Sequence, residues 1–568
     1  MLLEQPEIFN IVASNLNQID LLNLSLVSYR FHTLSTPILF HSITVDSKYS
    51  RFDKEFKRTT YISKKKQILF FFKQDPSKLQ LVHEFTVNHL PSEFIDFEKK
   101  LCDALPLFIN LQVLKLDGLE VYRFNDLLNS ITNPGLLQVL NVKLNRLSDF
   151  NILNSLNKDP NRSKFKLKSL NIGPISNSPS SSSMTLVDEL TLSGYLGNLT
   201  DPELTQELRI VKGRRKVQLT DLVNGAAPID DYLDWIPELV KMKSLTKLSL
   251  SDFNMDHLSL CSAYRGNVIA DDDKVVDLSQ LQFLELDNIN EVNSRKEPID
   301  TFLVNLINHN DGFPKLKKLK INVRQALADS IVLFLHHLRP NQLIELSLTM
   351  RYNPMKVATI QLELVTAMYI FMIRGQAESL QLLSFEILYE KNLGSSSILL
   401  TADEVKSLMS VKYPNLESLR FETKFSHLIS MKDQFFGCFP KLQRLWVLNS
   451  DSVTRHWGLG NEHPGIFDDW LSIQHLPEQL ISGEHRTTAD KDGGDSDAIG
   501  ENQYGKERDD KEINGSGHTN SSLSLKYIKV DKCLFEVKET TIATTSKTEV
   551  VPRDTIDEWF NEMTNVTF

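Results

Sequence analysis

Apolar residues along most of this chain recur in one short pattern, LxxLxL, which we call the strand motif. The clearest copies share their lead-in: "LQVLKLDGL" starts at Leu111, "LQVLNVKL" at Leu137 and "LQFLELDNI" at Leu281. Roughly one window in thirty would fit such a permissive pattern by chance, so the shared lead-ins carry the prediction. Each copy is predicted to be a short buried strand. Copies, apolar variants included, start at residues 111, 137, 167, 187, 245, 281, 316, 343, 382, 416, 442 and 525.

Between the strand motifs, apolar residues follow a helical spacing. Two segments each place four large apolar residues on one helical face: Phe124, Leu127, Leu128 and Ile131, and Phe302, Leu303, Leu306 and Ile307. Units of strand, turn and helix cannot bury their apolar faces alone and must stack on their neighbours. The predicted fold class is therefore α/β, a leucine-rich-repeat solenoid, and an ordinary parallel α/β domain is the alternative.

The first forty-five residues have a different pattern, which predicts three short helices. Apolar residues recur there at steps of three and four: Leu21, Leu24, Val27, Phe31 and Leu34. We expect Asp20 to cap the second helix and Pro37 to end the third. A unit this small is near the lower limit for independent stability, so we expect a partner to bury its excess apolar residues.

The remaining boundaries follow from changes in composition. We predict a helical connector with a first degenerate repeat at 46–104, irregular repeats at 105–482, and a last repeat with a C-terminal capping helix at 523–568. Trp559 and Phe560 should pack inward from that helix. Residues 483–522 are rich in Gly, Asp, Glu, Lys and Ser, and they form a predicted disordered acidic insert. The segment "SNSPSSSS" at 176–183 is a predicted flexible loop.

Composition and charge narrow the function classes. The 568 residues carry 63 Lys and Arg against 73 Asp and Glu, a net charge of −10, which argues against nucleic-acid binding. The four cysteines lie far apart and indicate a reducing compartment. Apolar runs are too short to span a membrane, and we expect a soluble protein of the cytoplasm or nucleus. No phosphate-binding, nucleophile or metal-ligand motif is found, so we expect no catalytic residues, no metal, no cofactor and no enzyme activity.

The first forty residues resemble an F-box. That family combines a proline, a helix with Ile/Leu pairs, an Asp-Leu, a Leu-rich helix, an aromatic residue and a closing Pro-x-Leu-Phe. This chain departs from the pattern at Gln5, where Leu is usual, and at Phe31, where Trp is usual. An F-box followed by leucine-rich repeats is a recurrent fungal-type architecture. The matching residues are Pro6, Ile8, Phe9, Val12, Leu16, Asp20, Leu21, Leu24, Val27, Phe31, Leu34, Pro37, Leu39 and Phe40.

The resemblance implies a non-catalytic substrate-recognition subunit of an SCF-type (Skp1–cullin–F-box) ubiquitin ligase. The repeats would hold the target protein. Two alternatives remain: a Skp1-binding regulator that sequesters a target such as a small GTPase, and a leucine-rich scaffold without Skp1. In the last case residues 1–45 would only cap the first repeat. The Skp1-binding residues implied by the resemblance are Pro6, Ile8, Phe9, Val12, Leu16, Leu21, Leu24, Val27, Phe31, Pro37 and Leu39.

A candidate target-binding face follows from the strand motif itself. Its fourth and sixth positions point inward, so the third, fifth and seventh face the open side of the sheet. Early copies place polar residues there: Lys115, Asn141, Asn171 and Thr191. Late copies place a predicted interface hot spot there: Arg420, Arg444, Trp446, Leu448 and Tyr527.

Neighbouring strands lie about 4.8 Å apart, so Arg420 should lie beside Trp446. In the alternative interpretation, the insert or the C-terminal tail covers Trp446, and Arg420 only pairs with Glu386 on the next strand.

Overall fold

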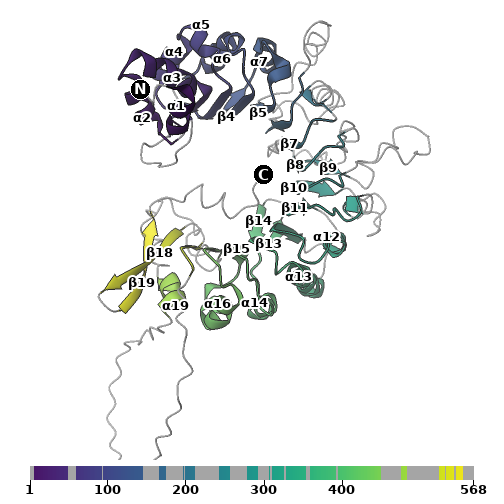
Figure 1. Cartoon of the computed structure of the whole chain (residues 1–568). Coiled ribbons are helices and arrows are strands. Elements are labelled where there is room, and N and C mark those ends of the chain that lie inside the picture. Colours follow the sequence, from purple (N-terminus) through teal and green to yellow (C-terminus); the bar gives the residue numbers. More distant parts are fainter. Residues whose placement is uncertain are drawn as a thin grey trace, which may run out of the picture. The chain divides into compact units, whose positions relative to one another are not determined.

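The computed structural model shows a mixed α/β protein whose strands are mostly parallel (Figure 1). The chain forms two compact units, Met1–Met372 with Leu388–Gly394, and Ile373–Ile387 with Ser395–Thr567. Each unit is described by itself. The structure describes residues 5–13, 15–48, 59–91, 94–144, 165–173, 196, 199–201, 203–211, 242–255, 278–291, 303, 306–307, 310–324, 328–352, 359–391, 394–448, 475–482, 524–530, 533–542 and 545–553.

The first unit opens with the three predicted helices, α1 (Pro6–Ala13), α2 (Gln18–Ser25) and α3 (Tyr29–His41). The predicted cap of α2 was wrong: Asn17 is the N-cap, and its side chain accepts a hydrogen bond from the Asp20 N–H at 2.9 Å. Pro37 does not end α3 but lies inside it. Proline removes one helical hydrogen bond, and Leu39, beyond it, is still packed against Phe9 and Leu21. Burial of the following turn therefore outweighs the local cost.

The helices are joined directly to the sheet. Helix α3 ends at His41, and strand β1 (Ser42–Asp46) begins at the next residue, inside the segment predicted to be only helical. The neighbouring β2 (Thr60–Ile62) also contacts the helices. The side-chain oxygen of Gln18 accepts a hydrogen bond from the Tyr61 N–H at 3.0 Å, and the Thr60 hydroxyl donates to the Leu39 carbonyl at 2.6 Å. The three helices and the first strands therefore form one hydrogen-bonded body.

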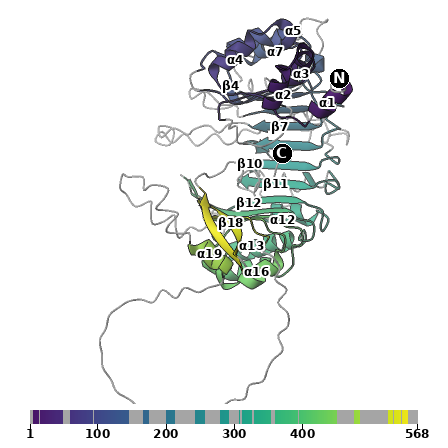
Figure 2. The same cartoon turned by 60° about the vertical axis from the view of Figure 1, so that its left-hand side comes forward.

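The strands of the first unit pair in parallel. Strand β1 lies between β2 and β3, and from β3 onward the strands follow chain order, with the short β9 beside the end of β10. Strands β10, β11 and β12 lie side by side (Figure 2). The bounds are β3 (Glu84–His89), β4 (Val113–Val121), β5 (Val139–Leu144), β6 (Ser169–Ile172), β7 (Glu207–Val211), β8 (Lys247–Ser251), β9 (Asn254–Met255), β10 (Phe283–Glu291), β11 (Lys318–Arg324) and β12 (Glu345–Tyr352).

Helices are described in the connections between β2 and β5 and in those that follow β11, where they lie on one side of the sheet (Figure 1). In α7 the predicted apolar face is buried, which confirms the helical interpretation of that segment. Leu303, Leu306 and Ile307 are also buried, whereas Phe302 lies outside the described residues. The helices are α4 (Lys65–Phe72), α5 (Pro76–Leu79), α6 (Phe97–Ala104), α7 (Phe124–Ser130), α12 (Ala328–His336) and α13 (Thr359–Arg374), with 3-10 turns at Leu105–Leu107 and Pro134–Leu136.

The strand motif fixes which side chains enter the core. In the copy at Leu137, the first, fourth and sixth residues, Leu137, Leu140 and Val142, are all fully buried. Strand β7 belongs to a copy that the apolar pattern missed, because Thr205 occupies its first position. Thr205 is buried, and its hydroxyl donates to the Leu167 carbonyl at 2.8 Å. A hydroxyl that makes a hydrogen bond can thus replace an apolar residue at this position.

The second unit continues the motif and ends differently from the prediction. Strands β13, β15, β16 and β17 pair in parallel, but β18 and β19 follow as an antiparallel pair. The copy expected to start at 382 starts at Leu380 instead, because the register aligns Leu383 with Leu419. The bounds are β13 (Leu382–Lys391), β14 (Gly394–Ser397), α14 (Ala402–Leu408), β15 (Ser418–Glu422), α15 (Phe425–Ser430), α16 (Lys432–Cys438), β16 (Arg444–Leu448), α19 (His475–Ser482), β17 (Tyr527–Val530), β18 (Cys533–Ile542) and β19 (Thr545–Arg553).

Several sequence predictions fall outside the described residues. They concern the strand motif at 187 with Thr191, the loop at 176–183, the acidic insert at 483–522, and the closing helix with Trp559 and Phe560. Within the described residues, the strand that follows the copy at 167 is that of the copy at Thr205, because β6 pairs directly with β7.

Phe71 is the centre of an aromatic cluster that joins α3, α4 and β3. Its ring lies 6.2 Å from that of Phe40 and 6.1 Å from that of Phe85. Phe71→Ala should lower the free energy of unfolding by about 3–5 kcal/mol, because it removes a buried ring and leaves a cavity between its aromatic neighbours. The adjacent Phe70 is 70% exposed, so Phe70→Ala should change stability by less than about 1 kcal/mol. Urea denaturation followed by circular dichroism measures both, and equal effects would contradict this core assignment.

Candidate protein-binding surfaces

The predicted Skp1-binding residues do not share one surface. Phe9, Leu21 and Leu39 form the core between the three helices and are buried. Four others are partly buried: Ile8, Leu16, Leu24 and Phe31. The exposed members are Pro6, Val12, Val27 and Pro37. The predicted set therefore mixes residues that hold the helices together with residues that a partner could touch.

A further group of large apolar residues is exposed on the same helices, and the sequence prediction missed it. Leu26 is 83% exposed, and Ile19, Leu22 and Leu26 follow the i, i+3, i+7 spacing of one helical face. The sequence pattern was matched to the buried face, so residues next to the matched leucines were not considered. Together with Val12 and Val27 we call this group the N-terminal apolar set: Ile11, Val12, Ile19, Leu22, Leu26, Val27 and Tyr29.

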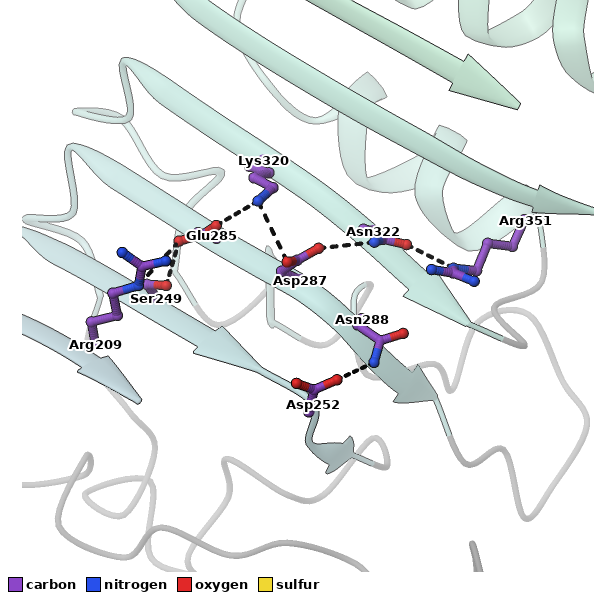
Figure 3. A network of polar contacts seen from close by, with 9 residues as sticks. All are labelled: Arg209, Ser249, Asp252, Glu285, Asp287, Asn288, Lys320, Asn322 and Arg351. Atoms are coloured by element: carbon purple, nitrogen blue, oxygen red, sulfur yellow. Dashed lines mark hydrogen bonds and ion pairs between the residues drawn. The ribbon is translucent and has the colours of Figure 1, made fainter. Parts of the chain in front are cut away.

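A network of polar contacts crosses the middle of the first unit (Figure 3). Its centre is Glu285 on β10, which is 4% exposed. The Glu285 carboxylate accepts hydrogen bonds from the Lys320 ammonium at 2.7 Å and the Ser249 hydroxyl at 2.5 Å, and Arg209 lies 3.9 Å away. All four residues occupy the fifth position of their strand motifs and are aligned by the parallel register. We call the whole network the polar belt: Arg209, Ser249, Asp252, Glu285, Asp287, Asn288, Lys320, Asn322 and Arg351.

The seventh positions extend the polar belt. Lys320 lies 3.5 Å from Asp287, which accepts a hydrogen bond from the Asn322 amide at 2.8 Å. The Asn322 oxygen in turn accepts one from Arg351 at 2.8 Å. Burial opposes the charge on Lys320, but the carboxylates of Glu285 and Asp287 outweigh burial and raise the pKa of Lys320. The cations and carboxylates of the polar belt therefore balance one another.

Asp252, in the bend between β8 and β9, and Asn288, within β10, complete the belt. Both occupy the eighth position of their motifs and have positive φ angles of 66° and 55°. Asn and Asp tolerate this conformation better than other residues with a Cβ. The Asn288 amide donates to the Asp252 carboxylate (Figure 3). The side-chain bond thus joins the bend after β8 to the irregularity in β10, where the register shifts between Asp287 and Ile289.

The second unit carries the predicted hot spot, and its strand register is confirmed. Arg420 lies opposite Trp446, and Trp446 lies opposite Lys529 on β17. The Arg420 guanidinium carbon is 4.2 Å from the indole centroid, and the Lys529 ammonium is 3.7 Å from it. Arg420 also lies 3.4 Å from the Glu386 carboxylate, as the alternative interpretation expected. Both contacts of Arg420 therefore exist together.

The other predicted residues surround this pair of contacts. Arg444 lies opposite Tyr527, and its Nε donates to the Ser418 hydroxyl at 2.5 Å. Burial lowers the pKa of Arg444. Leu448 lies opposite Glu422 in the register. We call the group of Arg420, Arg444, Trp446, Tyr527 and Lys529 the Trp446 cluster.

Lys529 was missed by the sequence analysis, although the signal was present. It occupies the fifth position of the motif at 525, the same position as Arg420 and Trp446 in their copies. It is only 2% exposed. Burial, together with the like charge of Arg420, lowers the pKa of Lys529 to about 8.

The early open-face residues differ from the late ones. Lys115 is exposed, and Asn141 donates a hydrogen bond to the Asp117 carboxylate at 2.6 Å. Asn171 is partly buried. Cations and an aromatic ring come together in the Trp446 cluster but not at these early positions.

The described residues hold no group of three or more His, Cys, Asp and Glu side chains that could hold a metal ion. In that part of the chain, no helix combines the length and the apolar composition that a membrane crossing requires. Comparison of the sequence with models of known protein families and with curated proteins gives no match.

Lys320→Met should destabilise the first unit by about 3 kcal/mol, because it leaves the buried Glu285 carboxylate without its closest cation. Lys318 provides a matched control on the same strand, since its pair with Glu345 is 2.9 Å long but more exposed. Lys318→Met should cost less than about 1 kcal/mol. Urea denaturation of both variants tests the difference, and similar losses would show that the polar belt is not a structural centre.

The lowered pKa of Lys529 predicts a specific pH dependence of stability. The folded chain loses the proton near pH 8, whereas the unfolded chain keeps it until about pH 10.5. The unfolded state therefore binds more protons between these values, and stability should rise with pH there by up to about 1.4 kcal/mol per unit. Urea denaturation at pH 7.5, 8.5 and 9.5 should show this rise in the wild type relative to Lys529→Met. The exposed Lys526 is the control, because Lys526→Met should keep the slope.

Proposed function

We propose that this chain is the substrate-recognition subunit of an SCF-type ubiquitin ligase. In this proposal α1–α3 are an F-box that binds a Skp1-type adaptor, and the strand motifs belong to an irregular leucine-rich-repeat array that binds a target protein. The chain itself then supplies positioning, and the chemistry takes place on other subunits.

The observation that supports this proposal best is the N-terminal apolar set. Seven large apolar residues are exposed on α1–α3 and on the turn between α2 and α3, although the core of these helices is already filled by Phe9, Leu21 and Leu39. Burying one exposed Leu or Ile side chain contributes about 1.5–3 kcal/mol, so this set is a strong reason for a partner to bind there. The family pattern in the same forty residues indicates which partner.

The second part of the proposal concerns the open face of the sheet. Parallel strands align the third, fifth and seventh motif positions into rows, and these rows present polar, charged and aromatic side chains. Long rows of this kind are suited to protein binding, as in other repeat proteins. The adaptor and the target would therefore bind different parts of the chain.

A double substitution tests the adaptor site without disturbing the core. Leu22→Asp with Leu26→Asp changes two exposed residues, so the helices should remain folded. Two carboxylates in a desolvated interface should weaken adaptor binding by at least about a hundredfold. The matched control is Asn10→Asp with Asn23→Asp, which adds the same charge at exposed polar positions of α1 and α2.

Co-purification with a Skp1-type adaptor, followed by detection of cullin, gives the result. Adaptor and cullin with the wild type and control, and neither with the Leu22/Leu26 variant, support the ligase subunit. Adaptor without cullin would replace it with the sequestering regulator. Absence of adaptor from the wild type would overturn the proposal.

A further inference from the structure

Helix α13 (Thr359–Arg374) carries a group of exposed apolar residues that is separate from the N-terminal apolar set. Leu364 is 62% exposed, Phe371 is 63% exposed and Met368 is 36% exposed. Their steps of four and three residues place them on one side of the helix, and the exposed Ala367 lies on that side as well. We call these four residues the α13 apolar face.

The opposite side of α13 is apolar too, and it is buried. Its buried apolar residues are Val365, Tyr369, Ile370 and Ile373. A helix that is apolar on all sides is normally buried on all sides, and α13 is not. On the helices before and after it in the chain, α12 and α14, the described residues that are exposed are polar: His336, Asp403 and Lys406. The α13 apolar face is therefore a continuous apolar surface rather than a set of scattered residues.

The α13 apolar face is complementary to a second copy of itself. If two α13 helices pack antiparallel about a two-fold axis between residues 367 and 368, Leu364 of one copy lies opposite Phe371 of the other. The small Ala367 of one copy then lies opposite Met368 of the other, so that a large side chain meets a small one at the centre. Each residue of the face thereby gains an apolar neighbour.

The charged residues near the two ends of α13 fit the same arrangement. Glu363 is exposed and Arg374 is half-buried, and helical geometry places both on the same side of the α13 apolar face. Within one chain they are about 16 Å apart along the helix, which is too far for an ion pair. In the antiparallel pair, Glu363 of one copy comes within about one helical turn of Arg374 of the other. The two-fold axis brings these opposite charges together twice.

We propose that the chain forms a homodimer in which α13 packs antiparallel against α13 of a second copy. Helix α13 lies on the helical side of the sheet (Figure 1), whereas the third, fifth and seventh motif positions face the other side. A single helix pair buries less than the roughly 1,200 Å² of a stable interface, so we expect a dimer that dissociates on dilution. This inference does not rest on the proposed function.

Sedimentation velocity of the full chain at about 1 to 200 μM covers the micromolar affinity expected of a small interface. The wild type should shift from monomer to dimer over this range. Leu364→Asp with Phe371→Asp should weaken dimerisation at least about tenfold, because it places four carboxylates in an apolar interface. The matched control is Phe70→Asp with Ile95→Asp, which adds the same charge at other exposed apolar residues. It should leave the dimer affinity within about twofold.

A single cysteine tests the antiparallel register. In the proposed dimer residue 368 lies close to the two-fold axis, so Met368→Cys should form a disulfide between the copies on oxidation with copper phenanthroline. Glu363→Cys is the control on the same helix, because the two copies of residue 363 would lie about 13 Å apart, beyond the reach of a disulfide. Non-reducing gel electrophoresis shows the difference, with the wild type as the reference for the native cysteines.

The outcomes separate this inference from the proposed function. A wild type that stays monomeric over the whole range overturns the inference, as does a dimer that the Leu364/Phe371 variant retains as well as the control does. Equal disulfide formation by Glu363→Cys and Met368→Cys would overturn the antiparallel arrangement. A monomer that binds phosphatidylcholine vesicles through Leu364 and Phe371 would replace the second copy with a membrane surface. Absence of adaptor binding from the same wild-type preparation would overturn the proposed function and leave the dimer in place.

Discussion

The parallel hydrogen-bonded register of the strands is the constraint on which the rest of the structure depends. Each inner strand satisfies its backbone groups only through strands that are often 25 to 40 residues away in sequence. A slip of one residue would turn every buried leucine of that strand toward the open face. Because the register is held, equivalent motif positions lie in rows. Both the polar belt and the Trp446 cluster are built from such rows.

The sequence predicted the parts of the fold that depend on apolar periodicity. The helix at Phe124–Ser130 and most of the strands lie where the pattern placed them. The errors arose where tertiary contacts override a local rule. Thr205 fills an apolar position because the Leu167 carbonyl accepts a hydrogen bond from its hydroxyl, and Leu380 rather than 382 begins its copy because strand pairing selects the register. The antiparallel strands β18 and β19 carry no copy of the strand motif, so the motif could not predict them.

For the candidate sites, the position of each residue in its strand was predictable, but its burial and its surroundings were not. The motif placed Arg420 beside Trp446, and the same rule applied to the fifth position would have found Lys529. The burial of Lys529 depends on what packs over it, which the motif does not encode. In the N-terminal helices, a family pattern does not separate residues that fill the core from residues that face solvent. Leu21 and Leu22 are adjacent and similar, yet one is buried and the other exposed.

The direct passage from α3 into β1 has a mechanical consequence. His41 ends the helix and Ser42 begins the strand, and the side-chain bonds of Gln18 and Thr60 tie both sides of this junction together. Such a junction has no linker residues about which the helices could rotate relative to the strands. A protein bound to the three helices would keep a fixed angle to β1 and its neighbours. Its orientation would be set by the fold rather than by the length of a tether.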